Sequence, residues 1–255
     1  MKGFSWKSKK QELISCIILL ILWEIVSIKI NNEIYLPRVE KILISMGDIF
    51  KEEGSLINIF SSLFRAIISF TAAMFLAVIL GVLSLVYPFF RNFLKPINAI
   101  GKIIPTMVLV VLAIVWFDKD NAPFIVGFAI VFPILYEGVL SSLKKVDKNL
   151  VEMCQIYNVS TKEKIKKIYI PVIKFYITGI MMSTFSLAFK VVIAGEVHGQ
   201  PKFGMGSAIQ IEKVNFNTTG IFAWIIIIAI LSILFDKANK LLVKRVYRWK
   251  YEDKN

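Results

Sequence analysis

Residues Val151–Pro171, VEMCQIYNVSTKEKIKKIYIP, lie between two long apolar segments. We expect two short helices joined by a turn. The first covers Leu150–Tyr157, and Asn158 follows where helices commonly end in a left-handed residue. Ser160–Glu163 has the S-x-x-E spacing of a capping box, which predicts the start of the second helix. Pro171 either stops that helix or lies in the first turn of a new one. A folded element of this kind between apolar segments indicates contact with a partner in water.

The rest of the chain is strongly apolar. It has 255 residues, of which 56% are hydrophobic, more than a soluble domain of this size needs. Crossing a hydrocarbon layer of ~30 Å takes roughly 20 apolar residues. Six such runs are present, at residues 13–30, 60–86, 97–117, 122–143, 173–195 and 218–238. The predicted fold is therefore an all-α, polytopic membrane protein with six transmembrane helices.

Charge alternates between the segments that join these runs. The segment 144–174 has eight basic and three acidic residues, and 87–102 has three basic and no acidic ones. The segment 29–55, by contrast, has four basic and five acidic residues. By the positive-inside rule, both termini and the loop containing Val151–Pro171 face the cytoplasm. The basic cytoplasmic segments account for the net charge of +13, so the charge needs no nucleic-acid partner to explain it. No aromatic–basic platform for binding nucleic acid is evident either.

The loop also carries a motif. Glu152, Met153 and Cys154 are followed by Asn158, and nine residues after Asn158 come Ile168, Ile170 and Pro171. This spacing resembles the cytoplasmic signature of ABC-importer permeases: E-A-A, three residues, Gly, nine residues, I-x-L-P. Both alanines and the glycine are substituted here, and Asn158 is able to keep the turn that the glycine makes. The resemblance implies that Glu152, Met153, Cys154, Asn158, Ile168 and Pro171 couple the chain to an ATPase.

Further motifs extend the resemblance over about residues 35–240. Each is similar to a motif of the taurine, sulfonate and nitrate branch of these permeases, in the same order and at comparable spacing. They are Asn58–Phe70 (S-L-x-R-x-x-x-G-F, with Ser69 for the glycine), Ile104–Pro105 (R-x-I-P), Val115–Phe117 (I-W-F-G), Phe132–Ile134 (F-F-P-I), Ala188–Glu196 (A-W-x-V-V-x-A-A-E) and Phe203–Gly206 (G-L-G).

The resemblance implies a type I ABC importer transmembrane fold with three parts. Residues 1–54 form a cytoplasmic segment, the first span and an outer loop. Residues 55–243 form the five-helix transmembrane domain with its coupling loop at 148–170, and 244–255 form a basic cytoplasmic tail. The implied location is the bacterial inner membrane. The implied partners are cytoplasmic ATPase subunits, an extracellular or lipid-anchored solute-binding protein, a second permease subunit in a homodimer, and membrane lipid, with no cofactor.

The implied function is ATP-driven import of a small solute such as a sulfonate, taurine or nitrate. The same machinery importing a vitamin precursor, such as the thiamine pyrimidine or riboflavin, is the alternative. No G-x-x-x-x-G-K-[ST] phosphate loop occurs in the sequence, so we expect the chain not to be an enzyme and to be driven by a separate ATPase. A self-sufficient secondary transporter is the rival from another class, but the inverted repeats and broken helices typical of one are not evident.

Four ionisable residues fall inside the predicted spans. They are Glu24, Arg65, Glu137 and Lys190. Charges in a membrane are costly and mark functional candidates by default, although pairing or snorkelling is the favoured role for each. If Arg65 and Lys190 instead face the pathway, they favour an anionic substrate. We therefore take Arg65, Lys190 and Glu196 as candidate pathway residues.

Two other features favour structural roles. Ser69, Ala73, Ala77 and Gly81 recur every four residues, a spacing that lets helix backbones approach closely. Packing within one subunit is the favoured reading over a subunit–subunit interface. His198 is the only histidine and has no second ligand at metal-binding spacing, so we expect a loop residue and no metal site.

Overall fold

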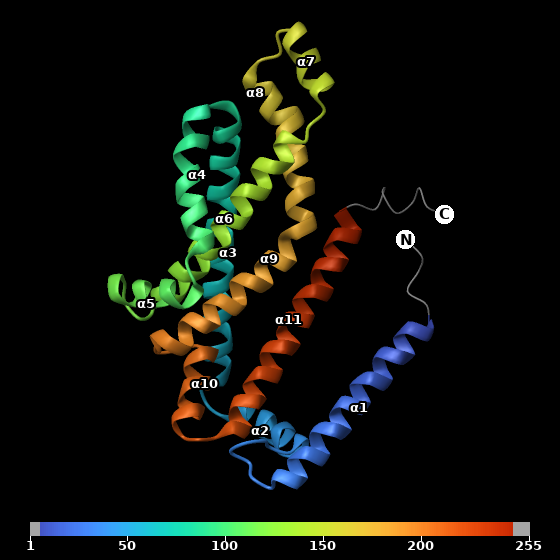
Figure 1. Cartoon of the computed structure of the whole chain (residues 1–255), viewed down its shortest axis with the longest axis vertical. Coiled ribbons are helices and arrows are strands. Elements are labelled where there is room, and N and C mark those ends of the chain that lie inside the picture. Colours follow the sequence, from blue (N-terminus) through green and yellow to red (C-terminus); the bar gives the residue numbers. More distant parts are fainter. Residues whose placement is uncertain (1–5, 247–255) are drawn as a thin grey trace. The chain divides into compact units, whose positions relative to one another are not determined.

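The computed structural model describes residues 6–246, and every regular element in that range is a helix. The first part of the predicted N-terminal segment and residues 247–255 of the predicted basic tail lie outside the described residues. The chain divides into two compact units. Within the described residues, one consists of residues 6–56 and 208–230, and the other of residues 57–207 and 231–246. Figure 1 shows the helices in chain order from blue to red.

In the first unit, helix α1 (Trp6–Ile30) is followed by a short turn and the amphipathic helix α2 (Val39–Lys51), which the sequence analysis did not predict. The end of α1 holds this turn. The Trp23 indole donates to the Pro37 carbonyl at 3.0 Å, and the Ser27 hydroxyl donates to the Leu36 carbonyl at 2.9 Å. The Glu24 carboxylate accepts from the Val39 N–H at 3.0 Å, a free donor at the start of α2. Glu24 therefore has a structural role, although its partner is a backbone N–H and not another charged side chain.

Helices α10 (Met205–Val214) and α11 (Thr218–Val246) are the last two helices of the described residues. Within the first unit, the ring of Phe222 meets that of Trp23 edge to face, with 5.1 Å between centroids. The Thr218 hydroxyl donates to the Ile34 carbonyl at 2.7 Å. These contacts join the start of α11 to the end of α1 and the turn after it.

The second unit is built on helices α3 (Ser55–Val86), α6 (Ala122–Lys144) and α9 (Ile170–Gly199), with α4 (Pro88–Ile103) and α5 (Thr106–Trp116) beside them. Its buried side chains come mainly from α6 and α9, including Val126, Val139 and Val192. The small-residue face of α3 lies against this core: Ser69, Ala73 and Ala77 have no exposed surface, and a Cβ on Gly81 would lie 2.7 Å from Val139. The favoured expectation of packing within the subunit is confirmed.

Five helices are long and apolar enough to span a membrane, within Leu13–Ile30, Ser55–Val86, Ala122–Lys144, Thr161–Gly199 and Thr218–Ala238. The run predicted at 97–117 is not one straight helix. It belongs to α4 and α5, which together pass the same test but meet at an angle of 107°. Pro105 explains the break, because proline has no N–H to donate and disfavours a helical residue before it. Counting this pair as one span gives the six that were predicted.

The loop between α6 and α9 forms a projection of short helices beyond their ends (Figure 1). It consists of α7 (Lys148–Ile156), α8 (Thr161–Lys164) and a π-helical turn η1 (Ile165–Tyr169) that runs directly into α9. From Thr161 to Gly199 the backbone is thus one helix of 39 residues. Pro171 does not stop it and lies in the first turn of α9. The wider π turn just before Pro171 accommodates a residue that cannot donate its own N–H.

Candidate functional site

A buried ion pair joins α3 to the end of α9. Arg65 Nη1 lies 2.8 Å from Glu196 Oε1, and Glu196 has no exposed surface. The sequence analysis ended this span at residue 195, but α9 continues to Gly199 and places Glu196 in its last turns. Burying a carboxylate is costly unless it is paired and hydrogen-bonded. The remaining contacts of Glu196 meet that condition.

The second carboxylate oxygen of Glu196 accepts two hydrogen bonds. The Ser62 hydroxyl donates to Oε2 at 2.6 Å, and the Gly206 backbone N–H donates to the same atom at 3.0 Å. Ser62 Oγ in turn accepts from the Met205 N–H at 2.8 Å. We call Arg65, Glu196, Ser62 and the backbone of Met205–Gly206 the Glu196 network.

Two glycines let the chain fold closely around this carboxylate. A Cβ on Gly204 would lie 2.7 Å from Glu196 Cδ, and a Cβ on Gly206 would lie 2.4 Å from the Ile193 carbonyl oxygen. Both distances are too short for a real Cβ. The F-G-M-G motif at Phe203–Gly206 therefore has glycine where the buried glutamate leaves no room for a side chain.

Arg65 makes further contacts at the edge of the network. Its Nη1 donates to the Phe203 carbonyl at 2.7 Å, and its Nε donates to the Asp120 carbonyl at 3.2 Å. The Asp120 carboxylate accepts from the Lys202 N–H at 2.9 Å. Arg65 thereby ties α3 to the loop before α6 and to the loop after α9. A pocket of about 420 Å³, lined in part by Ser61, Arg65 and Asp120, opens beside it.

The loop between α6 and α9, which the resemblance predicts to couple the chain to an ATPase and which is here called the coupling loop, has a cap at each end of α7. The Asp147 side chain accepts from the Asn149 N–H and caps α7. Asn158 has a φ of +50°, the left-handed conformation that was predicted. Its N–H donates to the Gln155 carbonyl at 3.0 Å, and the Val159 N–H donates to the Cys154 carbonyl at 2.9 Å. These two bonds are those of a Schellman motif, so asparagine ends α7 in the way that glycine commonly ends a helix.

Ser160 begins the second helix as predicted, since its hydroxyl accepts from the Glu163 N–H at 3.3 Å. Glu152 lies exposed in the middle of α7, whose start is capped by Asp147. Large apolar side chains of α7 and its end are also exposed: Met153 is 48% exposed, Ile156 77% and Tyr157 76%, whereas Cys154 is buried.

Comparison with known proteins agrees with this architecture. Residues 73–248, more than half of the chain, match the family model described as binding-protein-dependent transport system inner membrane component. The chain belongs to that family. It is a transport permease of the ABC-importer class rather than an enzyme, and it is an inner-membrane component with several spans. A permease of this family works with an ATPase and a solute-binding protein.

Individual relatives are similar over most of the permease. An ABC transporter permease protein of Methanocaldococcus jannaschii is 27% identical, over 98% of this chain and 97% of its own. The taurine transport system permease protein TauC of Escherichia coli is 19% identical over 96% and 92%. The riboflavin transport system permease protein RibX of Chloroflexus aurantiacus is 26% identical over 61% and 58%.

The permease also has the fold of a solved transporter. A chain of the MetNI methionine ABC transporter in inward-facing conformations superposes with a TM-score of 0.61 at 17% identity. The superposition covers 76% of the permease and 99% of the MetNI chain. The expected type I importer transmembrane fold is confirmed.

The candidate pathway residues of the permease are not all brought together. Arg65 and Glu196 pair with each other, while Lys190 lies on the exposed surface of α9. His198, expected in a loop, is exposed in the last turn of α9, where its Nδ1 lies 3.0 Å from the Ala194 carbonyl oxygen. Among the described residues, no three His, Cys, Asp or Glu side chains are grouped as a metal ion would require.

The sequence analysis did not assign roles to Asn58, Ser62 or Asn98. Asn58 Oδ1 accepts from the Gly204 N–H at 3.0 Å, and Asn98 Nδ2 donates to Glu137 at 2.7 Å. Ser62 and Asn98 lie on predicted spans, where a polar side chain needs a hydrogen bond, and this is the signal that points to their partners. Asn58 lies just before the span predicted at 60–86.

Proposed function

We propose that the permease imports a small anionic solute of the sulfonate, taurine or nitrate class, as a homodimer whose two α7–α8 loops dock on two cytoplasmic ATPase subunits. A solute-binding protein delivers the solute to the opposite side of the membrane. Both chain termini then face the cytoplasm with the basic loop, as the positive-inside rule expects.

One observation carries the coupling role: a capped element that exposes large apolar side chains is joined without a break to a membrane-spanning helix. Met153, Ile156 and Tyr157 offer an apolar surface to a groove in an ATPase. Because α8, η1 and α9 form one helix of 39 residues, a displacement of the loop moves α9 with it. Glu152, Cys154, Asn158, Ile168 and Pro171 shape this element.

The support for the solute class comes from two sources. The motifs shared with the taurine, sulfonate and nitrate branch, together with the similarity to TauC, favour a sulfonate. The similarity to RibX favours the alternative, a vitamin precursor. Arg65 borders a pocket, so it remains the candidate cation for an anionic solute, with Glu196 as its internal counter-ion and Lys190 further along α9.

The coupling proposal is tested by the variant Tyr157→Asp with Tyr35→Asp as its control. The two tyrosines are equally exposed, at 76% and 75%, but Tyr35 lies in the turn between α1 and α2. A charge at position 157 is expected to lower retention of the co-expressed ATPase on the purified permease by about tenfold or more, because it opposes burial in an apolar groove. Tyr35→Asp should leave retention unchanged.

Equal retention in the two variants would count against docking through this loop. Uptake assays with radiolabelled taurine and riboflavin, using the complete transporter with its binding protein, then separate the two solute classes. ATPase-free uptake driven by an ion gradient would favour the secondary-transporter rival.

A further inference from the structure

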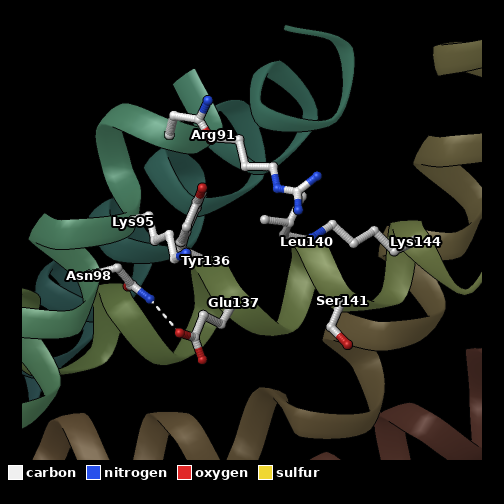
Figure 2. Close-up of a pocket in the computed structure, with 9 residues that line it drawn as sticks. Arg91, Lys95, Asn98, Tyr136, Glu137, Leu140, Ser141 and Lys144 are labelled. Carbon is white, nitrogen blue, oxygen red and sulfur yellow. Dashed lines mark hydrogen bonds between the residues drawn. The ribbon is translucent and has the colours of Figure 1, made fainter. Parts of the chain in front are cut away.

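A second polar site lies in the unit that contains the Glu196 network, between α4 and the second half of α6 (Figure 2). It is a pocket of about 390 Å³. From α4 come Arg91, Lys95 and Asn98, whose spacing of four and three residues places them on one face of the helix. From α6 come Tyr136, Glu137, Leu140, Ser141 and Lys144. The ion pair of Arg65 takes no part in this pocket.

Cations outnumber acids among these lining side chains. The lining has three cationic side chains, Arg91, Lys95 and Lys144, and one carboxylate, that of Glu137. Glu137 already has two partners, Asn98 Nδ2 at 2.7 Å and the Lys102 ammonium. None of the three lining cations has an ion-pair partner within the part of the chain that the structure describes. The pocket therefore has an excess of positive charge that the protein does not neutralise.

Asn98 adds a second requirement. Its side chain is 4% exposed, and its amide orientation is fixed because Nδ2 donates to Glu137. The Oδ1 atom is buried and has no hydrogen-bond partner. Buried acceptors in folded proteins are nearly always paired, and an unpaired one calls for an explanation. A bound donor group in the pocket would supply that partner.

We propose that this pocket binds a phosphate- or sulfonate-type oxyanion that carries a hydrogen-bond donor a few atoms away. The Arg91 guanidinium suits a tetrahedral oxyanion through paired N–H donors, and Lys95 and Lys144 add charge. Asn98 Oδ1 has almost no accessible surface, so the donor of the same ligand pairs with it only after a small shift of the Asn98 side chain. Two sources share this chemistry: a phospholipid headgroup such as phosphatidylglycerol, and a soluble amino-sulfonate such as taurine.

The position of the pocket gives such a ligand a mechanical role. Lys144 is the last residue of α6, and α7 begins at Lys148. A ligand held by Arg91 and Lys144 would therefore link α4 to the end of α6 next to the coupling loop. This inference does not depend on which solute the permease transports.

The test uses the full chain in two arms, with the variant Arg91→Gln/Lys144→Gln. Its matched control is Lys145→Gln/Lys148→Gln, which removes the same charge from exposed lysines outside the pocket. In the first arm, native mass spectrometry measures phosphatidylglycerol retained after purification from mixed phosphatidylglycerol and phosphatidylcholine. In the second arm, binding of radiolabelled taurine is measured in nanodiscs of phosphatidylcholine alone.

Each charge removed is expected to weaken binding about five-fold, and the double variant about twenty-five-fold. Loss in the variant but not in the control, in either arm, supports the site, and the arm in which it occurs identifies the source. Binding in neither arm, or equal binding in variant and control, would overturn the proposal. A size-exclusion profile like that of the unmodified chain shows that the variant is folded, as expected for exposed side chains.

Discussion

The two ends of α9 and its extension differ in almost every physical property. At one end Glu196 is fully buried, and its two carboxylate oxygens have three partners, Arg65 and Ser62 from α3 and the Gly206 N–H from the start of α10. At the other end the helix begins at Thr161 in an exposed loop that is held by local caps and a π turn. The Glu196 network fixes α9 within its unit, whereas most side chains of α7 and α8 are exposed and Cys154 is the one buried side chain of α7. One end is suited to stability and the other to meeting a partner.

The strongest way to break this comparison is to remove the buried carboxylate. Glu196→Ala leaves the Arg65 guanidinium and the Ser62 hydroxyl without their main acceptor. Breaking a buried ion pair by removing one partner typically costs about 3–5 kcal/mol. We expect a large fall in the thermal transition temperature of the purified permease, or failure to accumulate in the membrane.

Glu152→Ala is the matched change in the coupling loop, where the carboxylate is exposed. Surface substitutions usually change stability by no more than about 0.5 kcal/mol. Similar transition temperatures for Glu196→Ala and Glu152→Ala would show that the buried network does not stabilise the unit.

A smaller effect is expected from the glycines around Glu196. Gly206→Ala places a Cβ 2.4 Å from the Ile193 carbonyl oxygen, which is backbone and has little freedom to move. Overpacking of this kind costs about 1–3 kcal/mol. The control is Gly179→Ala in the middle of α9, where nothing lies within 4 Å of the added Cβ. Alanine is more stable than glycine in a helix interior by about 0.5–1 kcal/mol. Gly179→Ala should therefore have a higher transition temperature than the unmodified permease.

Equal transition temperatures for Gly206→Ala and Gly179→Ala would contradict the close approach of the loop after α9 to Glu196.

Local rules predicted one end of α9 well. The left-handed Asn158 and the Ser160 cap depend on neighbours within a few residues, so their spacing in the sequence is sufficient to place them. The spans were predicted from length and apolarity for the same reason. The short helix α2 was missed because it is not a long apolar run. Only its helical spacing of apolar residues, with Ile42 and Ile49 buried on one face, could have indicated it.

The other end could not be predicted in the same way. Arg65 and Glu196 are separated by 131 residues, and their pairing depends on how α3 and α9 pack. Arg65 was singled out from its cost in a membrane, and Glu196 was added as a candidate pathway residue, but neither was assigned to the other. The 107° bend at Pro105 is a similar case. Proline predicts a break in the helix, whereas the direction of the next helix follows from packing against α6 and α9.

The smallest effect on global stability, and the sharpest for the coupling loop, comes from Asn158→Val. Its φ of +50° costs a β-branched residue about 1–2 kcal/mol, because the left-handed conformation brings Cβ close to the next carbonyl oxygen. The strain is confined to an exposed turn, so it should loosen α7 and α8 while the transition temperature stays near that of the unmodified chain. We expect faster hydrogen exchange of the backbone amides at positions 158 and 159, and weaker ATPase retention.

Asn31→Val is the matched control, since Asn31 has a φ of +46° but lies in the turn after α1. It introduces the same backbone strain and should leave exchange in α7 and ATPase retention unchanged. Asn158→Gly should behave like the unmodified chain, because glycine adopts a positive φ without strain. If Asn158→Val kept normal exchange and retention, the shape of the loop would have to depend on contacts beyond its own caps. The two ends of α9 would then be more alike than their burial indicates.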